Sequence, residues 1–397
     1  MPSLLQTASV KITGKKKKPV WKYLLFFLII LFLTFTMLEG IARVLVFFYK
    51  DLPMEKKRII CHDITLHHAW VSSKKSIDSN RSIPYPLIIN KQGWVEQYDV
   101  TVEKPKDTYR IFYLGDSNTQ GVVAPEYKMV EIVEKMLNEK YSGSGIKFEV
   151  INTGTSSYSC ILYYLLSKQI MKYSPDLVVL NIDMTDVPND FLYRRTAVRK
   201  ENNDYVAVHP DLNSKYIMTP HGFVKYKTGK SLISKLSRYS DFMFFVDRFV
   251  SEYLCKKEID DSSADWLALN WTDEIKNNVN ESMKIITMNV EFLRKNNVRA
   301  MITGIPYYKQ YTGSFSEKPH EALQETAAKL KVPFLNSYLV LENKIKGSSM
   351  TDYYWDNDDS HFNIAGNKLW AQAQFEFICN PANNLLPFGR LNKKTAN

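Results

Sequence analysis

Two short polar sequences carry residues that could form a nucleophilic catalytic centre. The first is Gly115-Asp116-Ser117, which follows the β-rich run RIFYL (residues 110–114) and precedes a helix-like stretch. A serine that opens a helix at the carboxyl end of a strand meets unpaired backbone N–H groups and the positive end of the helix dipole. That position suits attack on a carbonyl and stabilisation of the resulting oxyanion. Serine is also a common helix cap, and for this tripeptide alone capping is the simpler interpretation.

The second sequence lies near the far end of the chain and reads WDNDDSHFNIAGNKLW (residues 355–370). It places Asp358 and His361 two residues apart, in a predicted polar turn before another helix. A serine hydroxyl needs a base, and an imidazole needs a group that fixes its tautomer and stabilises its protonated form. Asp358 and His361 could supply both from one loop, although an isolated Asp-x-x-His is more often a cap or turn. The adjacent Asp359 is a rival for the orienting carboxylate.

Taken together, the two sequences resemble the conserved blocks of the SGNH, or GDSL-type, hydrolase superfamily, in its membrane-anchored bacterial form. The resemblance covers about residues 105–380, and the residues that carry it are Gly115, Asp116, Ser117, Thr119 and Gly121 in the first block, and Asp358, His361, Phe362, Asn363 and Gly366 in the last. It implies Ser117 as the nucleophile, His361 as the general base and Asp358 as the orienting carboxylate. It also implies a three-layer α/β/α fold with a flavodoxin-like parallel sheet.

Two middle blocks depart from the family pattern at the expected oxyanion hole. In NTGTSSYS (residues 152–159), Ser157 stands where the family usually has a glycine that donates its N–H. In VVLNIDMTD (residues 178–186), Asp183 replaces a glycine and Thr185 replaces an asparagine donor. The donors that the resemblance implies are therefore the N–H groups of Ser117 and Ser157, with Thr185 as a third group. Gly154 and Asn189 are lesser candidates.

These departures bear on rate, because removing one oxyanion donor costs about 100- to 1000-fold. An N–H survives the change to Ser157, since only proline lacks one. The Thr185 hydroxyl can donate but is shorter than an asparagine side chain. A carboxylate at Asp183 could also repel the developing negative charge.

The elements between the blocks alternate between strand-like and helix-like patterns. Short apolar runs predict five strands, and apolar residues at helical spacing predict two long helices. Continuous apolar strands that alternate with amphipathic helices indicate a parallel sheet covered on both faces, with function at the carboxyl ends of its strands. The predicted strands are residues 110–114, 148–152, 176–182, 298–305 and 332–337, and the helices are residues 127–141 and a segment from Ile275 to Leu293.

A basic and then apolar segment opens the chain. Six lysines lie in the first 22 residues without an acid, followed by YLLFFLIILFLTFTML (residues 23–38) and then EGIARVLVFFYK, in which Glu39 and Arg43 stand one turn apart and can pair. No small-x-small cleavage site follows, so an uncleaved anchor in the lipid bilayer through residues 21–49 is favoured over a signal peptide. The positive-inside rule keeps the N-terminus cytoplasmic and places the rest on the extracytoplasmic side, periplasmic or cell-surface.

The predicted organisation has four parts. Residues 1–50 form the basic tail and anchor, and residues 51–104 form a linker in which residues 90–109 are expected to make turns and short strands. Residues 105–380 form the hydrolase-like domain, interrupted by an insertion at 191–272 that either caps the site or covers a sheet edge. Residues 381–397 are a C-terminal tail.

Composition excludes other classes of function. The net charge is +10, but removing the six N-terminal lysines leaves +4, so no nucleic-acid partner is expected. Four scattered cysteines without a CxxC pair argue against a metal site, and no cofactor is expected. The sequence allows one or two disulfides. Cys160 lies in an apolar run and is a candidate buried thiol. We expect three histidines to be surface or loop residues: His209, His221 and His320. We expect Trp355 and Phe362 to lie in the core rather than to contact a sugar.

The sequence therefore predicts a membrane-anchored serine esterase or acyl-transfer enzyme. From its location, its substrate is expected to be an O-acetyl or similar ester on an extracytoplasmic glycan or related envelope polymer. The family includes deacetylases and acetyltransferases of such polymers, and transfer would need a donor delivered by a membrane acyltransferase partner. The alternative is a catalytically impaired, SGNH-like binding or assembly module in envelope polysaccharide metabolism.

Overall fold

The computed structural model describes residues 20–48, 60–78, 83–201, 203–209, 216–219, 222–225, 232, 236, 239–249 and 262–391. Two compact units make up the chain. The larger contains Lys50–Lys230 and Val250–Asn397, and the smaller contains Met1–Tyr49 and Ser231–Phe249.

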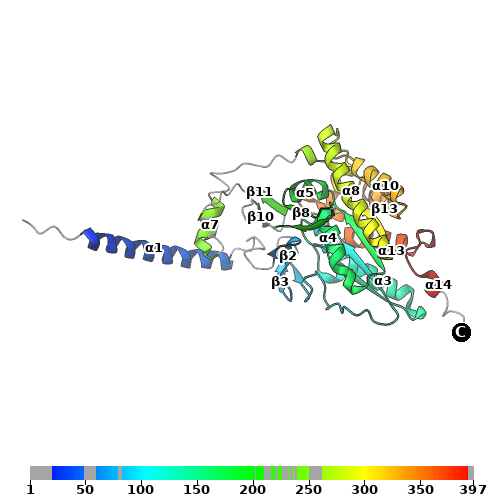
Figure 1. Ribbon diagram of the computed structural model, residues 1–397, viewed down its shortest axis with the longest axis horizontal. Coiled ribbons are helices and arrows are strands. Elements are labelled where there is room, and N and C mark those ends of the chain that lie inside the picture. The colour runs from blue at the N-terminus through cyan, green and yellow to red at the C-terminus, as the bar shows by residue number, and fades with distance from the viewer. Residues whose placement is uncertain are drawn as a thin grey trace, which may run out of the picture. The chain divides into compact units, whose positions relative to one another are not determined.

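A five-stranded parallel sheet is the centre of the larger unit (Figure 1). Its strands lie in the order β13-β12-β7-β5-β6, which is order 2-1-3-4-5 by chain position and matches flavodoxin-like folds. All five predicted strands are confirmed, as is the three-layer fold. The strands are β5 (Thr108–Leu114), β6 (Lys147–Asn152), β7 (Leu177–Ile182), β12 (Arg299–Gly304) and β13 (Phe334–Asn336).

Alternating side chains of these strands feed two hydrophobic cores, one on each face of the sheet. On β5, Phe112 and Leu114 enter one core, whereas Ile111 and Tyr113 enter the other. The first core is closed by α4 (Cys160–Ile170), α8 (Asp273–Lys295) and α10 (Lys318–Leu330), and the second by α3 (Met129–Lys140), α11 (Ser337–Ile345) and α13 (Ile364–Cys379). Both predicted long helices are present as α3 and α8.

Short elements complete the C-terminal half of this unit. They are α9 (Tyr308–Tyr311), α12 (Met350–Tyr353), the hairpin of β14 (Tyr354–Trp355) and β15 (Asp358–Phe362), and α14 (Phe388–Leu391). Leu385, Leu386 and Leu391 are buried in the core that α3, α11 and α13 close. The chain from residue 381 to 391 therefore packs on the domain, and residues 392–397 lie outside the described part.

The segment before β5 contains two hairpins, β1 (Ile60–Asp63) with β2 (His67–Trp70) and β3 (Lys75–Asp78) with β4 (Tyr85–Ile88). No strand occurs between β4 and β5, so the expected short strands in residues 90–109 are wrong apart from the start of β5. Asn90 explains the difference, because its Oδ1 accepts the N–H groups of Gln92 and Trp94, both at 3.0 Å. Such side-chain bonds to the backbone replace a strand ladder with turns.

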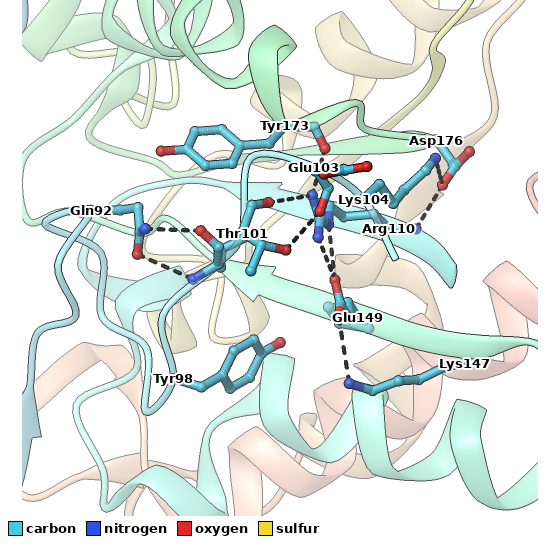
Figure 2. Close-up of polar contacts among 12 residues, drawn as sticks. Gln92, Tyr98, Thr101, Glu103, Lys104, Arg110, Lys147, Glu149, Tyr173 and Asp176 are labelled. Atoms are coloured by element: carbon cyan, nitrogen blue, oxygen red, sulfur yellow. Dashed lines mark hydrogen bonds and ion pairs between the residues drawn. The ribbon is translucent and has the colours of Figure 1, made fainter. Parts of the chain in front are cut away.

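A buried arginine ties this segment to the amino end of the sheet (Figure 2). Arg110 is fully buried, and its Nε and Nη2 donate to Glu149 Oε2 on β6 at 2.9 and 2.8 Å. Its Nη1 donates to the carbonyl oxygens of Thr101 and Tyr173 at 3.0 and 2.7 Å. Three stretches of chain are thereby fixed at the end of the sheet opposite the carboxyl ends of the strands.

Residues between β7 and α8 include the predicted insertion. The described elements there are α5 (Asp186–Tyr193), the hairpin of β8 (Ala197–Arg199) and β9 (Tyr205–Val208), the hairpin of β10 (Tyr216–Thr219) and β11 (Gly222–Lys225), and α7 (Asp241–Phe249). Of these, α7 belongs to the smaller unit. A capping role for the insertion stays a prediction.

The smaller unit consists of α1 (Val20–Phe48) and α7, which pack against each other. Residues Val20–Leu45 of α1 have a mean hydropathy of 2.5, and the helix is long and apolar enough to cross a membrane. An N-terminal signal sequence meets the same criteria. Lys22 is the described member of the N-terminal lysine cluster, and the other five lie outside the described residues.

Candidate active site

Ser117 stands at the junction of β5 and the short helix α2 (Ser117–Gln120). Asp116 caps this helix, with its Oδ1 accepting the Asn118 N–H at 2.9 Å. Gly115 is required at the end of the strand, because a Cβ there would lie 1.9 Å from Thr119 Oγ1. The turn thus presents Ser117 at the carboxyl edge of the sheet, where it is only half-buried.

His361 and Asp358 lie on β15, rather than in the predicted turn, and the sheet edge brings them to Ser117. Ser117 Oγ is 2.8 Å from His361 Nε2, and His361 Nδ1 is 2.8 Å from Asp358 Oδ2. The His361 and Asp358 side chains are 13% and 15% exposed, so the contacts are sheltered while the serine stays accessible. Asp359 instead has its Oδ2 3.6 Å from Lys309 Nζ, and the imidazole is oriented by Asp358.

Ser360, between the two functional residues, supports the same arrangement. Its Oγ donates to Asp358 Oδ1 at 2.6 Å and lies 3.0 Å from His361 Nδ1. The His361 N–H also donates to Asp358 Oδ1, at 3.2 Å. Asp358 therefore accepts several hydrogen bonds from its own strand. These bonds hold the carboxylate in the orientation in which it contacts the imidazole.

The end of β7 places Asp183 next to the Asp116 carboxyl group. Burial, and after it the nearby Asp183, raise the pKa of Asp116 well above its usual range, and a hydrogen bond joins the two carboxyl groups. Asp183 also accepts hydrogen bonds from Tyr307 Oη at 2.6 Å and from Asn118 Nδ2 at 2.8 Å.

Two of the candidate oxyanion donors, Thr185 and Gly154, donate hydrogen bonds to other residues. The Thr185 hydroxyl and the Thr185 N–H both donate to Asp183 Oδ1 at 2.8 Å. The Gly154 N–H donates to Asn152 Oδ1 at 3.0 Å. Asn189 lies on α5, one turn beyond Thr185, and within the described chain no hydrogen bond links its side chain to Ser117.

The remaining two candidates are the backbone N–H groups of Ser117 and Ser157. Neither donates to an acceptor within the described ranges. The segment that carries Ser157 lies along α2, because Thr155 N donates to the Gly115 carbonyl at 3.1 Å and Ser156 Oγ donates to Gln120 Oε1 at 2.7 Å. Ser117 and Ser157 are thus the donors that this arrangement leaves for an oxyanion.

Ser157 has a left-handed backbone conformation, with φ at +64°. This conformation favours glycine and costs other residues about 1–2 kcal/mol. The resemblance expects a glycine at this position, so the backbone geometry that suits glycine is kept although the residue has changed. Its neighbourhood must hold the conformation against the strain.

Two residues that the sequence did not single out fix this turn. Tyr193 Oη donates to the Ser157 carbonyl at 2.7 Å, and His68 Nε2 lies 2.9 Å from the Ser156 carbonyl. Both side chains are buried, and Tyr158 packs its ring on His68 with centroids 4.9 Å apart. The carbonyls on both sides of the Ser157 peptide nitrogen are thereby held, which sets the direction of the Ser157 N–H. His68 lies on a separate hairpin, so no local pattern could have identified it.

The other residues considered from sequence lie apart from the triad. His320 is buried on α10, stacks on Tyr338 and has its pKa lowered to about 3 by burial, so a surface position was wrong for it. His209 is exposed as expected, and His221 lies outside the described residues. Cys160 is a buried free thiol, as is Cys379, whereas the side chain of Cys61 and all of Cys255 lie outside the described part.

The aromatic residues near His361 are core residues. Phe362 is 2% exposed and packs on Trp370 and Tyr354, and Trp355 is 6% exposed within a small cluster that includes Tyr85. Within the described ranges, no group of three or more His, Cys, Asp or Glu side chains could hold a metal ion.

The chain matches no family model and no curated protein. Solved structures resemble it weakly. An acetylxylan esterase from Geobacillus stearothermophilus is 12% identical, with a TM-score of 0.40, over 68% of this chain and 94% of its own. An alpha/beta hydrolase from the metagenome of Lake Arreo, Spain, is 10% identical, with a TM-score of 0.39 over the same shares. A two-domain esterase active on acetylated mannans is 13% identical, with a TM-score of 0.35, over 68% of this chain and 49% of its own. The chain's own sheet order and layers define its fold.

Proposed function

We propose that this protein is a membrane-anchored serine esterase or acyl-transfer enzyme of the SGNH type. The observation that carries the proposal is the continuous contact from Ser117 Oγ through His361 to Asp358, with both distances at 2.8 Å. Hydroxyl, imidazole and carboxylate in this order are the groups that activate a serine.

The chemistry follows from these contacts. His361 Nε2 takes the hydroxyl proton as Ser117 Oγ bonds to the acyl carbon, and the N–H groups of Ser117 and Ser157 stabilise the oxyanion. The proton then passes from His361 to the departing alkoxide, which leaves as an alcohol. Water, or a second hydroxyl, loses a proton to His361 as it attacks the acyl-enzyme, and Ser117 is regenerated. Asp358 stabilises the imidazolium at each stage.

The substrate proposed is an O-acetyl or similar ester on an extracytoplasmic glycan or related envelope polymer. Two features support this location: α1 is apolar enough to span a bilayer, and the lysines before it would keep the N-terminus in the cytoplasm. In a transferase, a membrane acyltransferase would supply the acyl donor. Incubation with an acetylated oligosaccharide, with and without an acceptor sugar, separates release of acetate from transfer.

A second candidate is a non-catalytic binding or assembly module. It is favoured by the hydrogen bond that the Thr185 hydroxyl donates to Asp183 rather than to an oxyanion. Loss of a third oxyanion donor lowers rate without altering the triad. The full chain in detergent micelles, treated with a fluorescent phosphonate that labels active serines and assayed on short acyl esters, distinguishes the two. The esterase predicts labelling and hydrolysis that Ser117→Ala abolishes and the exposed-serine control Ser142→Ala keeps. If the folded wild-type chain shows neither labelling nor turnover, the esterase is contradicted and the binding module is supported.

A further inference from the structure

In the smaller unit, α7 satisfies a carboxylate that α1 carries in an otherwise apolar stretch. Glu39 Oε2 accepts Ser240 Oγ at 2.7 Å and the Phe242 N–H at 3.0 Å, while Glu39 Oε1 accepts the Asp241 N–H at 3.2 Å. Arg43 Nε adds a fourth bond at 3.0 Å. The Glu39 side chain is only 14% exposed as a result.

The depth of Glu39 follows from the length of α1. A bilayer core about 30 Å thick takes about 20 helical residues, and a span that starts near Val20 therefore ends near Glu39. Beyond Glu39 the helix continues to Phe48 and is apolar apart from Arg43. An unpaired carboxylate at that depth is costly, and the start of α7 removes the cost by supplying three donors. The first turn of α7 must then lie at the boundary between lipid tails and headgroups.

The packing of the two helices agrees with this placement. Phe35 and Ala42 lie on the same face of α1 as Glu39, at i−4 and i+3, and Phe35 meets the Phe242 ring edge-on at 5.7 Å. Ala42, one turn beyond Glu39, is 4% exposed.

The composition of α7 suits an interfacial helix. Its sequence is DFMFFVDRF, and Phe242, Phe245, Val246 and Phe249 follow one another at helical spacing along one side. Phe249, at the end of this side, is 56% exposed. Residues 225–238, which precede α7, contain five basic residues and no acid, a composition that favours the headgroups of anionic lipids.

We propose that α7 is a second membrane contact, which lies in the outer interface of the bilayer beside the end of α1 without crossing it. Lipid is the occupant of this stripe beyond Phe242, whose ring packs on Phe35 of α1. This inference rests on the proposed anchoring of the chain by α1. It gives the domain a bilayer attachment in the middle of its sequence in addition to the one at its N-terminus, which suits an enzyme acting on a membrane-linked or membrane-proximal polymer.

Spin labels on the full chain in phosphatidylcholine–phosphatidylglycerol nanodiscs test the inference. Cys61 and Cys255 are first replaced by serine, and single labels are then placed by Phe245→Cys and Phe249→Cys. Their collision rates with lipid-soluble oxygen and with a water-soluble nickel chelate are compared. Oxygen is expected to exceed nickel at both sites, and less so at the matched control Asp241→Cys, which lies off the stripe.

A label at Leu31→Cys, in the middle of α1, tests the anchoring by α1 separately from the interfacial role of α7. If oxygen dominates at Leu31 while nickel dominates at Phe245 and Phe249, the anchor stands and the interfacial role of α7 is overturned. If nickel dominates at Leu31 as well, the anchoring fails and the inference with it. Glu39→Leu should abolish the preference for oxygen at Phe249, whereas Gly40→Ala, beside it, should keep it because a Cβ there meets nothing within 4 Å. An unchanged preference in Glu39→Leu would contradict the role of the carboxylate.

Discussion

Ser117 Oγ lies 2.8 Å from His361 Nε2, although 244 positions separate the two residues in the chain. The contact exists because β5 ends in a turn that presents Ser117, and the β14–β15 hairpin returns His361 to the same edge of the sheet. The edge lies at the switch point between β5 and β7, where the strand order reverses, as is usual for sites in open α/β sheets.

Asp358 rather than Asp359 should orient the imidazole. Replacing Asp358 by asparagine presents a donor where the carboxylate accepted and favours the wrong tautomer of His361, which lowers kcat by roughly 10⁴-fold. Asp359→Asn, which changes the charge equally, should keep kcat within about threefold, since Asp359 bonds to Lys309 instead. Steady-state hydrolysis of a short acyl ester by the two variants checks this. Equal losses would mean that the carboxylates share the role.

Tyr193 should position the oxyanion donor without touching substrate. Tyr193→Phe removes the hydrogen bond to the Ser157 carbonyl and should lower kcat about five- to tenfold with little change in KM, because about 1 kcal/mol of positioning is lost. Tyr164→Phe is the control, as its hydroxyl donates to Asp204 away from this turn. A Tyr193→Phe enzyme with a raised KM and an unchanged kcat would contradict the assignment.

The pair of Arg110 and Glu149 should make a large contribution to stability when it is broken on one side only. Arg110→Met leaves the buried Glu149 with only the exposed Lys147, at 3.4 Å, as a charged partner, and should lower the free energy of unfolding by about 3–5 kcal/mol. The double variant Arg110→Met/Glu149→Met should recover part of that loss, since no uncompensated charge remains. Thermal denaturation of the detergent-solubilised chain measures both. A double variant less stable than the single one would contradict this account, because Glu149 would then stabilise the fold even without Arg110.

Stability should fall as pH rises from about 4.5 towards 7 through the titration of Glu134. Burial raises the pKa of this carboxyl in the folded state to about 7, so the folded chain binds the proton more tightly than the unfolded chain. The stabilisation is present below the unfolded pKa and is lost as pH rises through the folded pKa. Glu134→Gln should therefore gain at most about 3 kcal/mol over wild type at pH 8 and almost nothing at pH 4. Denaturant unfolding at both pH values provides the measurement, and equal differences at the two would contradict it.

The strands and the residues of the candidate site could be located from sequence because their signals are local. Apolar runs such as residues 110–114 and 298–305 are bounded by polar turns, and both became strands of the sheet. Ser117 and the Asp358–His361 pair stood out because each combines a reactive side chain with a strand or helix boundary. Their meeting in space was inferred from resemblance, since no property of either segment specifies the other.

The supporting contacts could not be predicted, because they join segments without a shared pattern. His68 reaches Ser156 across 88 residues, and nothing in its own hairpin indicates a function. The left-handed backbone of Ser157 is likewise set by its surroundings, because serine has no intrinsic preference for it. The hydrogen bond of Thr185 to Asp183 depends on a side-chain rotation that sequence does not specify.

The pairing of α1 with α7 has a practical consequence for the preparation of soluble protein. A fragment that begins at residue 50 would lose Phe35 and Glu39 but would keep α7, whose phenylalanines would then face water and promote self-association. Replacing residues 231–249 by a short glycine–serine linker in the same fragment should remove that self-association. The strands β5 and β7 and the β14–β15 hairpin should stay unaltered. The two helices α1 and α7 are best removed together or kept together.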